Sequence, residues 1–192
     1  MSFSYYETIV STDIALHPKF VFPEYRHSHM SFHPRDEILS AKWVTMIHEL
    51  GIQLPDHIQI FFKPQYFVNN DAHVDTAKLD GKIRVYAFNW VIGGRDSLMK
   101  WFKPTEEMKP VRKETNLGTG YISYPNHNFD LPVIDSVKIA GDRLTLVNTG
   151  IPHAIFNGPE PRYCVSIRPM MPKFMSWEET VAGFQHIIIQ RK

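Results

Sequence analysis

The chain has 192 residues, a formal net charge of +1 and a single cysteine, Cys164. Hydrophobic residues make up 43% of it and charged residues 21%, the proportions of one globular domain with a substantial core. The balanced charge argues against broad electrostatic binding of duplex nucleic acid, and a lone cysteine excludes an intrachain disulfide. Residues 1–10 lack the features of a signal peptide, and no apolar run approaches the about 20 residues of a membrane-spanning helix. We therefore expect a cytoplasmic protein with no membrane partner.

Helix signals occur near the two ends of the chain. Over residues 35–50, four large apolar residues recur at helical spacing, and Gly51 follows as a stop signal. Near the C-terminus, Ser176 begins the capping-box sequence Ser-Trp-Glu-Glu. The sequence therefore predicts one helix over about 35–50 and a second over about 177–188.

Between these helices the pattern is one of short strands and turns. Eight segments are rich in β-branched or aromatic residues and are bounded by Gly, Pro, Asn or Asp. They predict a single, mainly β domain, either a barrel or a double-sheet jelly roll of the cupin type, with its core at about 58–170 and the helices outside. The predicted strands cover residues 58–68, 83–92, 97–102, 120–124, 135–140, 143–147, 153–156 and 162–167.

The triplet His73-Val74-Asp75 and the later His153 carry the clearest chemical signal. Side chains two apart on a strand point to the same face, so His73 and Asp75 would aim at one point from one short strand. His153 begins another predicted strand and can supply a third ligand. Two imidazoles and one carboxylate, with the other positions open, are the ligand set of non-haem Fe(II) oxygenases. We predict that His73, Asp75 and His153 bind a catalytic metal ion.

Arg162 lies nine residues after His153 and opens the last predicted strand. On that strand Arg162, Cys164, Ser166 and Arg168 share one face, which could line a cavity. A guanidinium matches a carboxylate through two parallel hydrogen bonds. Arg162 is the leading candidate to hold such a group, and Arg168 is the alternative.

Three further residues are weaker candidates. Asn89 lies in a largely apolar strand, so its amide needs a partner, and contact with a bound co-substrate and a bond to backbone are both open. Trp101 and Tyr86 either line the pocket of the co-substrate or substrate, with Trp101 the candidate for co-substrate contact, or pack in the core, and packing is the commoner role for aromatic residues.

A second group of histidines, His27, His29 and His33, follows Arg26. It lacks a nearby acid at matching register, which argues against a second metal site. We interpret this segment as an exposed loop or lid near the mouth of the barrel, able to touch a substrate.

The set His73-x-Asp75, His153 and Arg162 resembles the Fe(II)- and 2-oxoglutarate-dependent oxygenases of the double-stranded β-helix fold, over about residues 58–170. The stretches 85–92 and 97–102 are similar to small oxygenase-like proteins often carried by tailed phages. The resemblance implies Fe(II), 2-oxoglutarate and O2 as cofactor and co-substrates, and hydroxylation with release of succinate and CO2.

The resemblance also implies a serine or threonine two positions after the arginine. Cys164 stands there in this chain, and Ser166 follows two positions further on as a candidate for co-substrate contact.

Two other functions stay open at this point. One is a catalytically inactive β-barrel, acting as a binding or virion-associated protein. The other is a cupin-like metalloenzyme that does not use 2-oxoglutarate. For an enzyme of either kind, we expect a small molecule or peptide as primary substrate rather than duplex nucleic acid.

Overall fold

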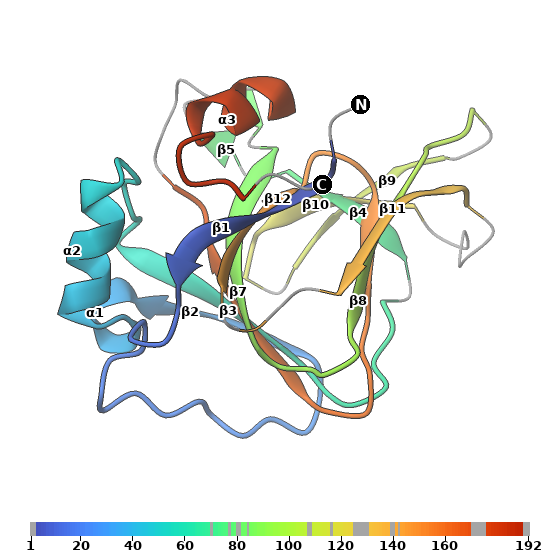
Figure 1. Ribbon diagram of the computed structural model, residues 1–192. Coiled ribbons are helices and arrows are strands. Elements are labelled where there is room, and N and C mark those ends of the chain that lie inside the picture. Colours follow the sequence, from blue (N-terminus) through green and yellow to red (C-terminus); the bar gives the residue numbers. More distant parts are fainter. Residues whose placement is uncertain are drawn as a thin grey trace.

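The computed structural model describes residues 3–69, 71–76, 78–79, 82–83, 85–106, 109–115, 117–124, 131–138, 141, 143–169 and 176–189. The fold is mainly β, as the sequence predicts. Two six-stranded antiparallel sheets face each other, and the helices of the described residues lie outside them (Figure 1).

The first sheet carries the helices on its outer face. Its central strands are rich in β-branched and aromatic residues, and six successive residues of the strand Tyr86–Gly93 are buried. Such a continuous apolar run is typical of a strand covered on both faces. In spatial order the strands are β1 (Tyr5–Ser11), β12 (Arg143–Asn148), β7 (Tyr86–Gly93), β14 (Arg162–Ile167), β3 (His57–Lys63) and β2 (His29–Pro34).

The second sheet holds the triplet at 73–75 and the strand that begins at His153. Its spatial order is β11 (Val133–Lys138), β8 (Leu98–Phe102), β13 (His153–Phe156), β4 (Ala72–Asp75), β10 (Gly120–Tyr124) and β9 (Val111–Glu114). A separate two-stranded ribbon consists of β5 (Lys78–Leu79) and β6 (Lys82–Ile83).

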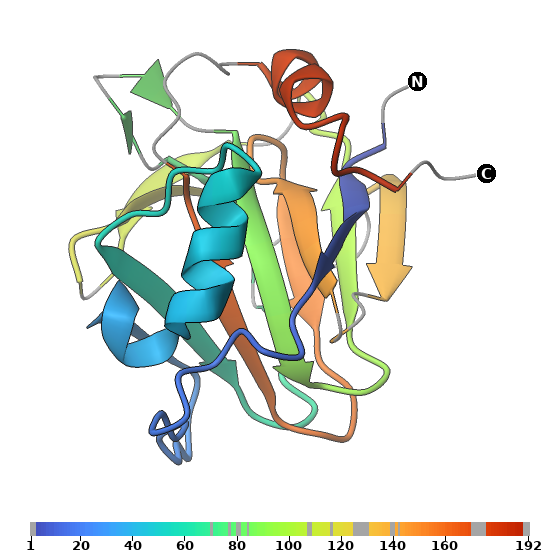
Figure 2. The same ribbon diagram turned by 60° about the vertical axis from the view of Figure 1, so that its left-hand side comes forward.

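The largest hydrophobic cluster lies between the first sheet and the helices. On β14, Val165 and Ile167 point outward into this cluster, where they join Trp43 and Ile47 of α2 (Ala41–Glu49). Figure 2 shows α2 lying across the outer face of this sheet. Because the apolar side chains of β14 are used in this way, its alternate, polar side chains point inward between the two sheets.

The predicted helix at 35–50 is two helices. The first, α1 (Arg35–Ile38), ends at Leu39, whose backbone is extended and forms a bridge to Leu16. Ser40 then caps α2 by accepting a hydrogen bond from the Trp43 backbone N–H. The interruption buries Leu39 against the preceding segment, which a continuous helix would not allow.

The predicted helix at 177–188 is shorter than expected. α3 (Trp177–Gly183) has the predicted capping box at Ser176. Beyond it, Ile188 forms a bridge to Thr8, and the Ile189 backbone N–H donates to the Glu7 carbonyl. The run of β-branched residues after the helix thus pairs with β1 instead of continuing as helix.

Most predicted strands are present, with some changes at their ends. The strand predicted at 58–68 ends at Lys63, because Pro64 follows and Tyr66 has a positive φ of 55°. The one predicted at 83–92 is divided into β6 and β7. β11 lies at Val133–Lys138, and residues 139–140 of that prediction are outside the described residues.

The strands β1, β2, β5 and β9 were not predicted from the sequence. Each lies at the edge of its sheet. β2 and β9 have no buried residues, so neither shows the apolar alternation that marks a half-buried strand.

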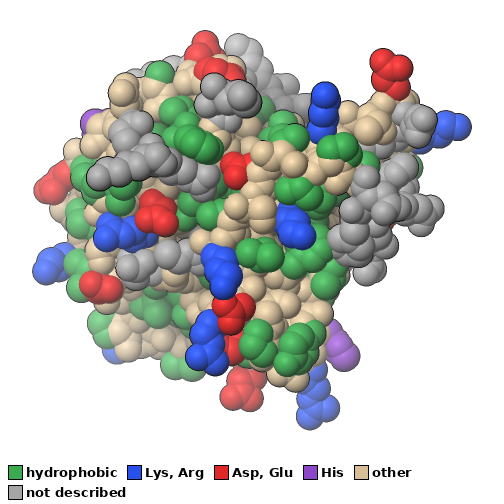
Figure 3. All heavy atoms as spheres, turned by 45° about the vertical axis from the view of Figure 1, so that its right-hand side comes forward, with side chains coloured by type: hydrophobic (Ala, Val, Ile, Leu, Met, Phe, Trp, Pro, Cys, Tyr) green, Lys and Arg blue, Asp and Glu red, His purple; other side chains and the backbone are tan. Residues whose placement is uncertain are grey.

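None of the helices in the described part of the chain has the length and apolar character needed to cross a membrane. On the face shown in Figure 3, the described lysine and arginine side chains are interspersed with aspartate and glutamate. This mixture agrees with the net charge of +1.

The contact between α2 and the first sheet can be tested by mutation. Trp43 is fully buried, and its indole N–H donates to the Ser11 carbonyl at 3.2 Å. We expect Trp43→Ala to lower the free energy of unfolding by about 3–5 kcal/mol, measured by urea denaturation, because it leaves a large cavity. Val21→Ala, at a position 80% exposed, is the control and should change it by less than about 0.5 kcal/mol. A small effect of Trp43→Ala would contradict this packing.

Candidate metal centre

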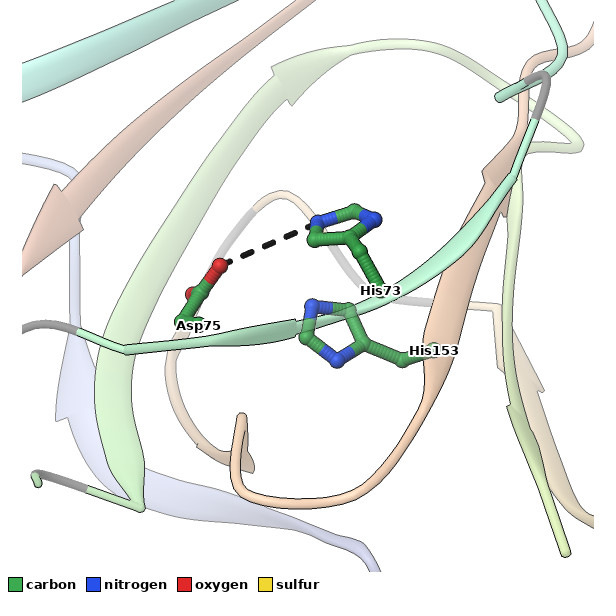
Figure 4. A group of neighbouring side chains, drawn as sticks. All are labelled: His73, Asp75 and His153. Carbon is green, nitrogen blue, oxygen red and sulfur yellow. Dashed lines mark ion pairs between the residues drawn. The ribbon is translucent and has the colours of Figure 1, made fainter. Parts of the chain in front are cut away.

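The two predicted ligand segments lie side by side in the second sheet. β4 pairs with β13 so that His73 stands directly opposite His153, and their ring centroids are 4.5 Å apart. Asp75 points to the same face as His73, with 3.8 Å between the His73 Nε2 and Asp75 Oδ1 atoms. One ligand atom from each residue lies within 4.8 Å of the other two, and the side chains converge as Figure 4 shows. The three residues can hold a metal ion.

A backbone contact prepares His153 for this role. Its Nδ1 atom lies 2.9 Å from the carbonyl oxygen of Ile151. A carbonyl only accepts, so Nδ1 carries the proton and donates, and Nε2 keeps its lone pair. A hydrogen bond on one ring nitrogen is the usual way to orient the other toward a metal.

Both imidazoles are held in their neutral form. Burial, and after it the neighbouring His153, lowers the pKa of His73 to about 4. Burial also lowers the pKa of His153, although the Asp75 carboxylate acts in the opposite direction. Neutral imidazole is the form that binds a metal, so protons compete little for these ligands near neutral pH.

Asp75 is held as a carboxylate by an arginine from the opposite sheet. Burial alone would raise its pKa, but the charge of Arg168 and its hydrogen bond lower the pKa of Asp75 below its usual range. The Arg168 Nη2 atom donates to Asp75 Oδ2, while Oδ1 faces His73. One carboxylate oxygen is therefore used by Arg168 and the other is directed at the centre.

The triad opens into a cavity of about 510 Å³ between the two sheets. Of the other predicted site residues, Asn89, Arg162, Ser166 and Arg168 line this cavity. The remaining lining is mixed polar and apolar, from β2, β3, β8, β9, β10, β13, Cys164 of β14 and the adjoining loops.

Trp101 is not among the residues that line the cavity. It is fully buried in a cluster with Met99 and Val147, and its indole N–H donates to the Asn148 carbonyl at 2.8 Å. Its side chain packs between the sheets beside His153, its register partner, and so supports that ligand from one side. The prediction that Trp101 contacts a co-substrate is therefore replaced by a packing role. Tyr86 is also buried, in the cluster between the first sheet and the helices.

Arg162 and Lys63 form a pair of cations at one end of the cavity. They are direct register partners on β14 and β3. Arg162 is 3% exposed, and its Nε atom has no hydrogen-bond partner among the described residues. Burial, and then the charge of Arg162, lowers the pKa of Lys63 to about 8. Like charges directly opposite in a sheet are destabilising, so binding of an anion between the two side chains would stabilise this pair.

The carboxylates that line the cavity are already matched. Asp75 is paired with Arg168, and Asp71 with Lys113 at 2.9 Å. Ser123 donates a further hydrogen bond to Asp71. No described carboxylate thus opposes the positive charge of Arg162 and Lys63, and the partners of the Lys63 ammonium are the uncharged Ser28 hydroxyl and the Phe67 ring. Of the two arginines that the sequence left as candidates to hold a carboxylate of a ligand, Arg168 is already paired with Asp75, and Arg162 has no carboxylate partner among the described residues.

The second group of histidines is divided by the structure. His27 is exposed, and His33 contacts Ser31 on its own strand. His29 starts β2, stacks on Tyr25 with ring centroids 4.1 Å apart, and lines the cavity. Among the described residues, the triad is the one group of three or more His, Cys, Asp or Glu residues close enough to share a metal ion. His29 and the adjoining Ser28 and Met30 therefore form part of the cavity wall, but His29–Pro34 is the edge strand β2 and not the loop or lid predicted from the sequence.

Sequence reasoning missed Lys63, Gln59 and Thr149, which all line the cavity. Lys63 and Gln59 belong to no recognisable motif, and a polar residue on a strand is most often exposed to solvent. Alternation along β3 places both on the inner face, so the register of this strand could have identified them once its partner was known.

In comparisons with known proteins, no family model matches the sequence, and no curated protein matches it.

If the three residues form a metal site, removal of one imidazole should weaken the binding of a divalent metal ion. We expect His153→Ala to weaken anaerobic Co(II) binding, measured by isothermal titration calorimetry, by at least about a hundredfold, because even loss of a group that only orients a ligand costs up to that factor. His57→Ala removes an exposed imidazole at the start of β3 and should leave the affinity unchanged. Equal affinities in the two variants would contradict the assignment.

The low pKa values of the two imidazoles also predict a pH dependence of stability for the metal-free protein. Their pKa values are lower when folded than the 6.5 of the unfolded chain, so the unfolded state binds more protons below that pH. The stability is fully present above pH 6.5 and is lost as the pH falls toward about 4, and His73 alone should account for a loss of about 2 kcal/mol by pH 5. Urea denaturation between pH 7 and 5 should show a smaller loss in His73→Gln than in wild type, and an equal loss would exclude this origin.

Proposed function

We propose that the protein is an Fe(II)- and 2-oxoglutarate-dependent dioxygenase that hydroxylates a primary substrate. The observation that carries the proposal is one cavity holding two features, a His-Asp-His triad and a pair of cations that no described carboxylate opposes. The first suits a divalent metal with open positions, and the second suits the far carboxylate of a dicarboxylate co-substrate.

The triad fits iron by the chemistry of its donors. Fe(II) accepts imidazole nitrogen and carboxylate oxygen, and three protein ligands leave room for a chelating co-substrate and O2. Arg168 supports this assignment, because it occupies one oxygen of Asp75 and favours coordination through the other. When bound, iron would supply the activation of O2, with 2-oxoglutarate as the source of two electrons and succinate and CO2 as its products.

The cation pair fits the other end of 2-oxoglutarate. Arg162 can hold a carboxylate through two parallel hydrogen bonds, and its Nε atom, which has no partner among the described residues, is one of the available donors. Lys63 adds a second positive charge at the same register. Cys164, next on that face of β14, is buried and lines the cavity between Arg162 and Ser166.

The order of the strands supports the double-stranded β-helix. In the first sheet the order is β12-β7-β14-β3, and in the second it is β11-β8-β13-β4. Among these eight, the chain passes to the opposite sheet at every step except from β8 to β11. Such interleaving of two antiparallel sheets is typical of jelly rolls and cupins.

The cations also separate this proposal from its alternatives. A cupin-like enzyme without 2-oxoglutarate has no need of a buried, unopposed Arg162. An inactive binding protein would not be expected to keep three convergent ligands with neutral imidazoles.

The proposal is tested by turnover. Anaerobic addition of Fe(II) and 2-oxoglutarate should give a weak visible charge-transfer band, and exposure to O2 should give succinate. His153→Ala should abolish both. Wild-type protein that binds neither iron nor 2-oxoglutarate would overturn the proposal.

Substitution of Arg162 should weaken the binding of 2-oxoglutarate without lowering the stability of the protein. We expect Arg162→Met to raise the Kd for 2-oxoglutarate by roughly a hundredfold, the equivalent of about 3 kcal/mol for a buried charge pair. The metal-free variant should melt no lower than wild type, because a buried charge without a carboxylate is removed. Arg95→Met, at a side chain 73% exposed, is the control and should change neither value. Unchanged affinity in Arg162→Met would point to the cupin-like alternative.

A further inference from the structure

A row of uncharged polar side chains crosses the inner face of the first sheet beside the triad. Gln59, Ser166 and Asn89 are register partners on β3, β14 and β7. Residues at one register on adjacent strands of a sheet point to the same face, so the three side chains lie next to one another. All three are at most 8% exposed and line the cavity. We call Gln59, Ser166 and Asn89 the amide row.

The amide row lies on the metal side of the cavity. Arg162 lies four residues before Ser166 on β14, and Lys63 lies four residues after Gln59 on β3. At a strand rise of about 3.3 Å per residue, this separates the cation pair from the amide row by about 13 Å. Arg168, two residues past Ser166, touches Asp75. The row is therefore separate from the cation pair and borders the triad.

The side-chain oxygen of Asn89 is not used by the fold. This Oδ1 atom is buried and has no hydrogen-bond partner among the described residues. Asn157 is a buried amide with a structural role in this protein. Its Nδ2 atom donates to three backbone carbonyls and its Oδ1 atom accepts from Ser97, so both ends of the amide have partners. An unpaired buried amide oxygen is costly to stability, so its retention at Asn89 indicates a ligand.

Gln59 is poorly satisfied in the same way. Its Nε2 atom donates to the thioether sulfur of Met30 at 2.7 Å, and sulfur is a weak acceptor. Thr145 is the register partner of Asn89 on the next strand, β12. Its hydroxyl donates to the Asn89 backbone carbonyl and is therefore not available to a ligand. The row thus presents amide donors and an amide acceptor to the cavity, and none of its members is charged.

Apolar side chains flank the amide row. Phe61 lies on the inner face of β3 next to Gln59, and Met30 is the register partner of Phe61 on β2. Both line the cavity, as do Met99 and Ile155 from the opposite sheet. A ligand here would place a polar edge on the row and an apolar body against these side chains.

We propose that the amide row is the primary-substrate subsite and that it recognises a neutral carboxamide carried on an apolar or aromatic body. A carboxamide places an N–H donor beside a C=O acceptor and so matches the two amides of the row. A carboxylate would leave the Asn89 oxygen facing another acceptor. The assignment of the amide row to the primary substrate rests on the proposed oxygenase function. The preference of the row for a carboxamide does not depend on that function.

The test compares two probes of one shape, benzamide and acetophenone, on the metal-free protein by ligand-observed NMR. We expect benzamide to bind at least about fivefold more tightly than acetophenone, which lacks the N–H donors, the equivalent of one net hydrogen bond. Asn89→Leu and Gln59→Met should each abolish this preference. Gln53→Met replaces an exposed glutamine and should keep it. No preference in wild type, or a preference retained by Asn89→Leu, would overturn the proposal.

Two further measurements exclude other roles for the row. The Tm of Asn89→Leu should be no lower than that of wild type, and a drop of several degrees would make the amide structural. Benzamide should stay bound when Zn(II) and N-oxalylglycine are added, whereas displacement would assign the row to the co-substrate. Because the probe experiment needs no metal, a benzamide preference without any succinate formation would reject the oxygenase and keep the carboxamide site.

Discussion

The pairing of β4 with β13 is the constraint on which the candidate centre depends. It sets His73 opposite His153, and the alternation of β4 then brings Asp75 to the same point. A slip of one residue would turn both β4 ligands to the other face. The register is protected by burial, with Ala72 and Val74 on the opposite face of β4 and Trp101 packed beside His153. Arg168 then joins the two sheets through Asp75.

The inner face of the first sheet carries a graded series of chemistries along β3 and β14. Lys63 and Arg162 form a cationic end, Phe61 and Cys164 follow, and Gln59 and Ser166 form an uncharged polar end. Each step is two residues, about 6.6 Å. A fold selected for stability alone would not bury an arginine that no described carboxylate opposes and an unpaired amide oxygen in one cavity. These unsatisfied groups are the physical basis of both proposals.

The proposed activity rests on a site and not on ancestry. Jelly rolls host many unrelated activities, so strand order alone selects none. What narrows the choice is the coincidence, in one cavity, of neutral imidazoles, a carboxylate with one oxygen directed inward, and a separate cation pair. Each feature has a different physical origin, and together they suit a metal and a dicarboxylate.

The sequence by itself determined the mainly β architecture, most strand positions and the common face of His73 and Asp75, because these follow from local alternation and turn residues. His153 could be predicted as a third ligand from its residue type, but its place beside His73 depends on the pairing of β4 with β13. The capping box of α3 could also be predicted, whereas its early end could not, since pairing of Ile188 with Thr8 replaces helix there. Only the tertiary structure decided that Trp101 is packed in the core, that Arg168 belongs to Asp75, and that Lys63 stands beside Arg162. These outcomes depend on which strands become neighbours, and strand pairing joins residues far apart in the chain through backbone hydrogen bonds that carry no sequence signature.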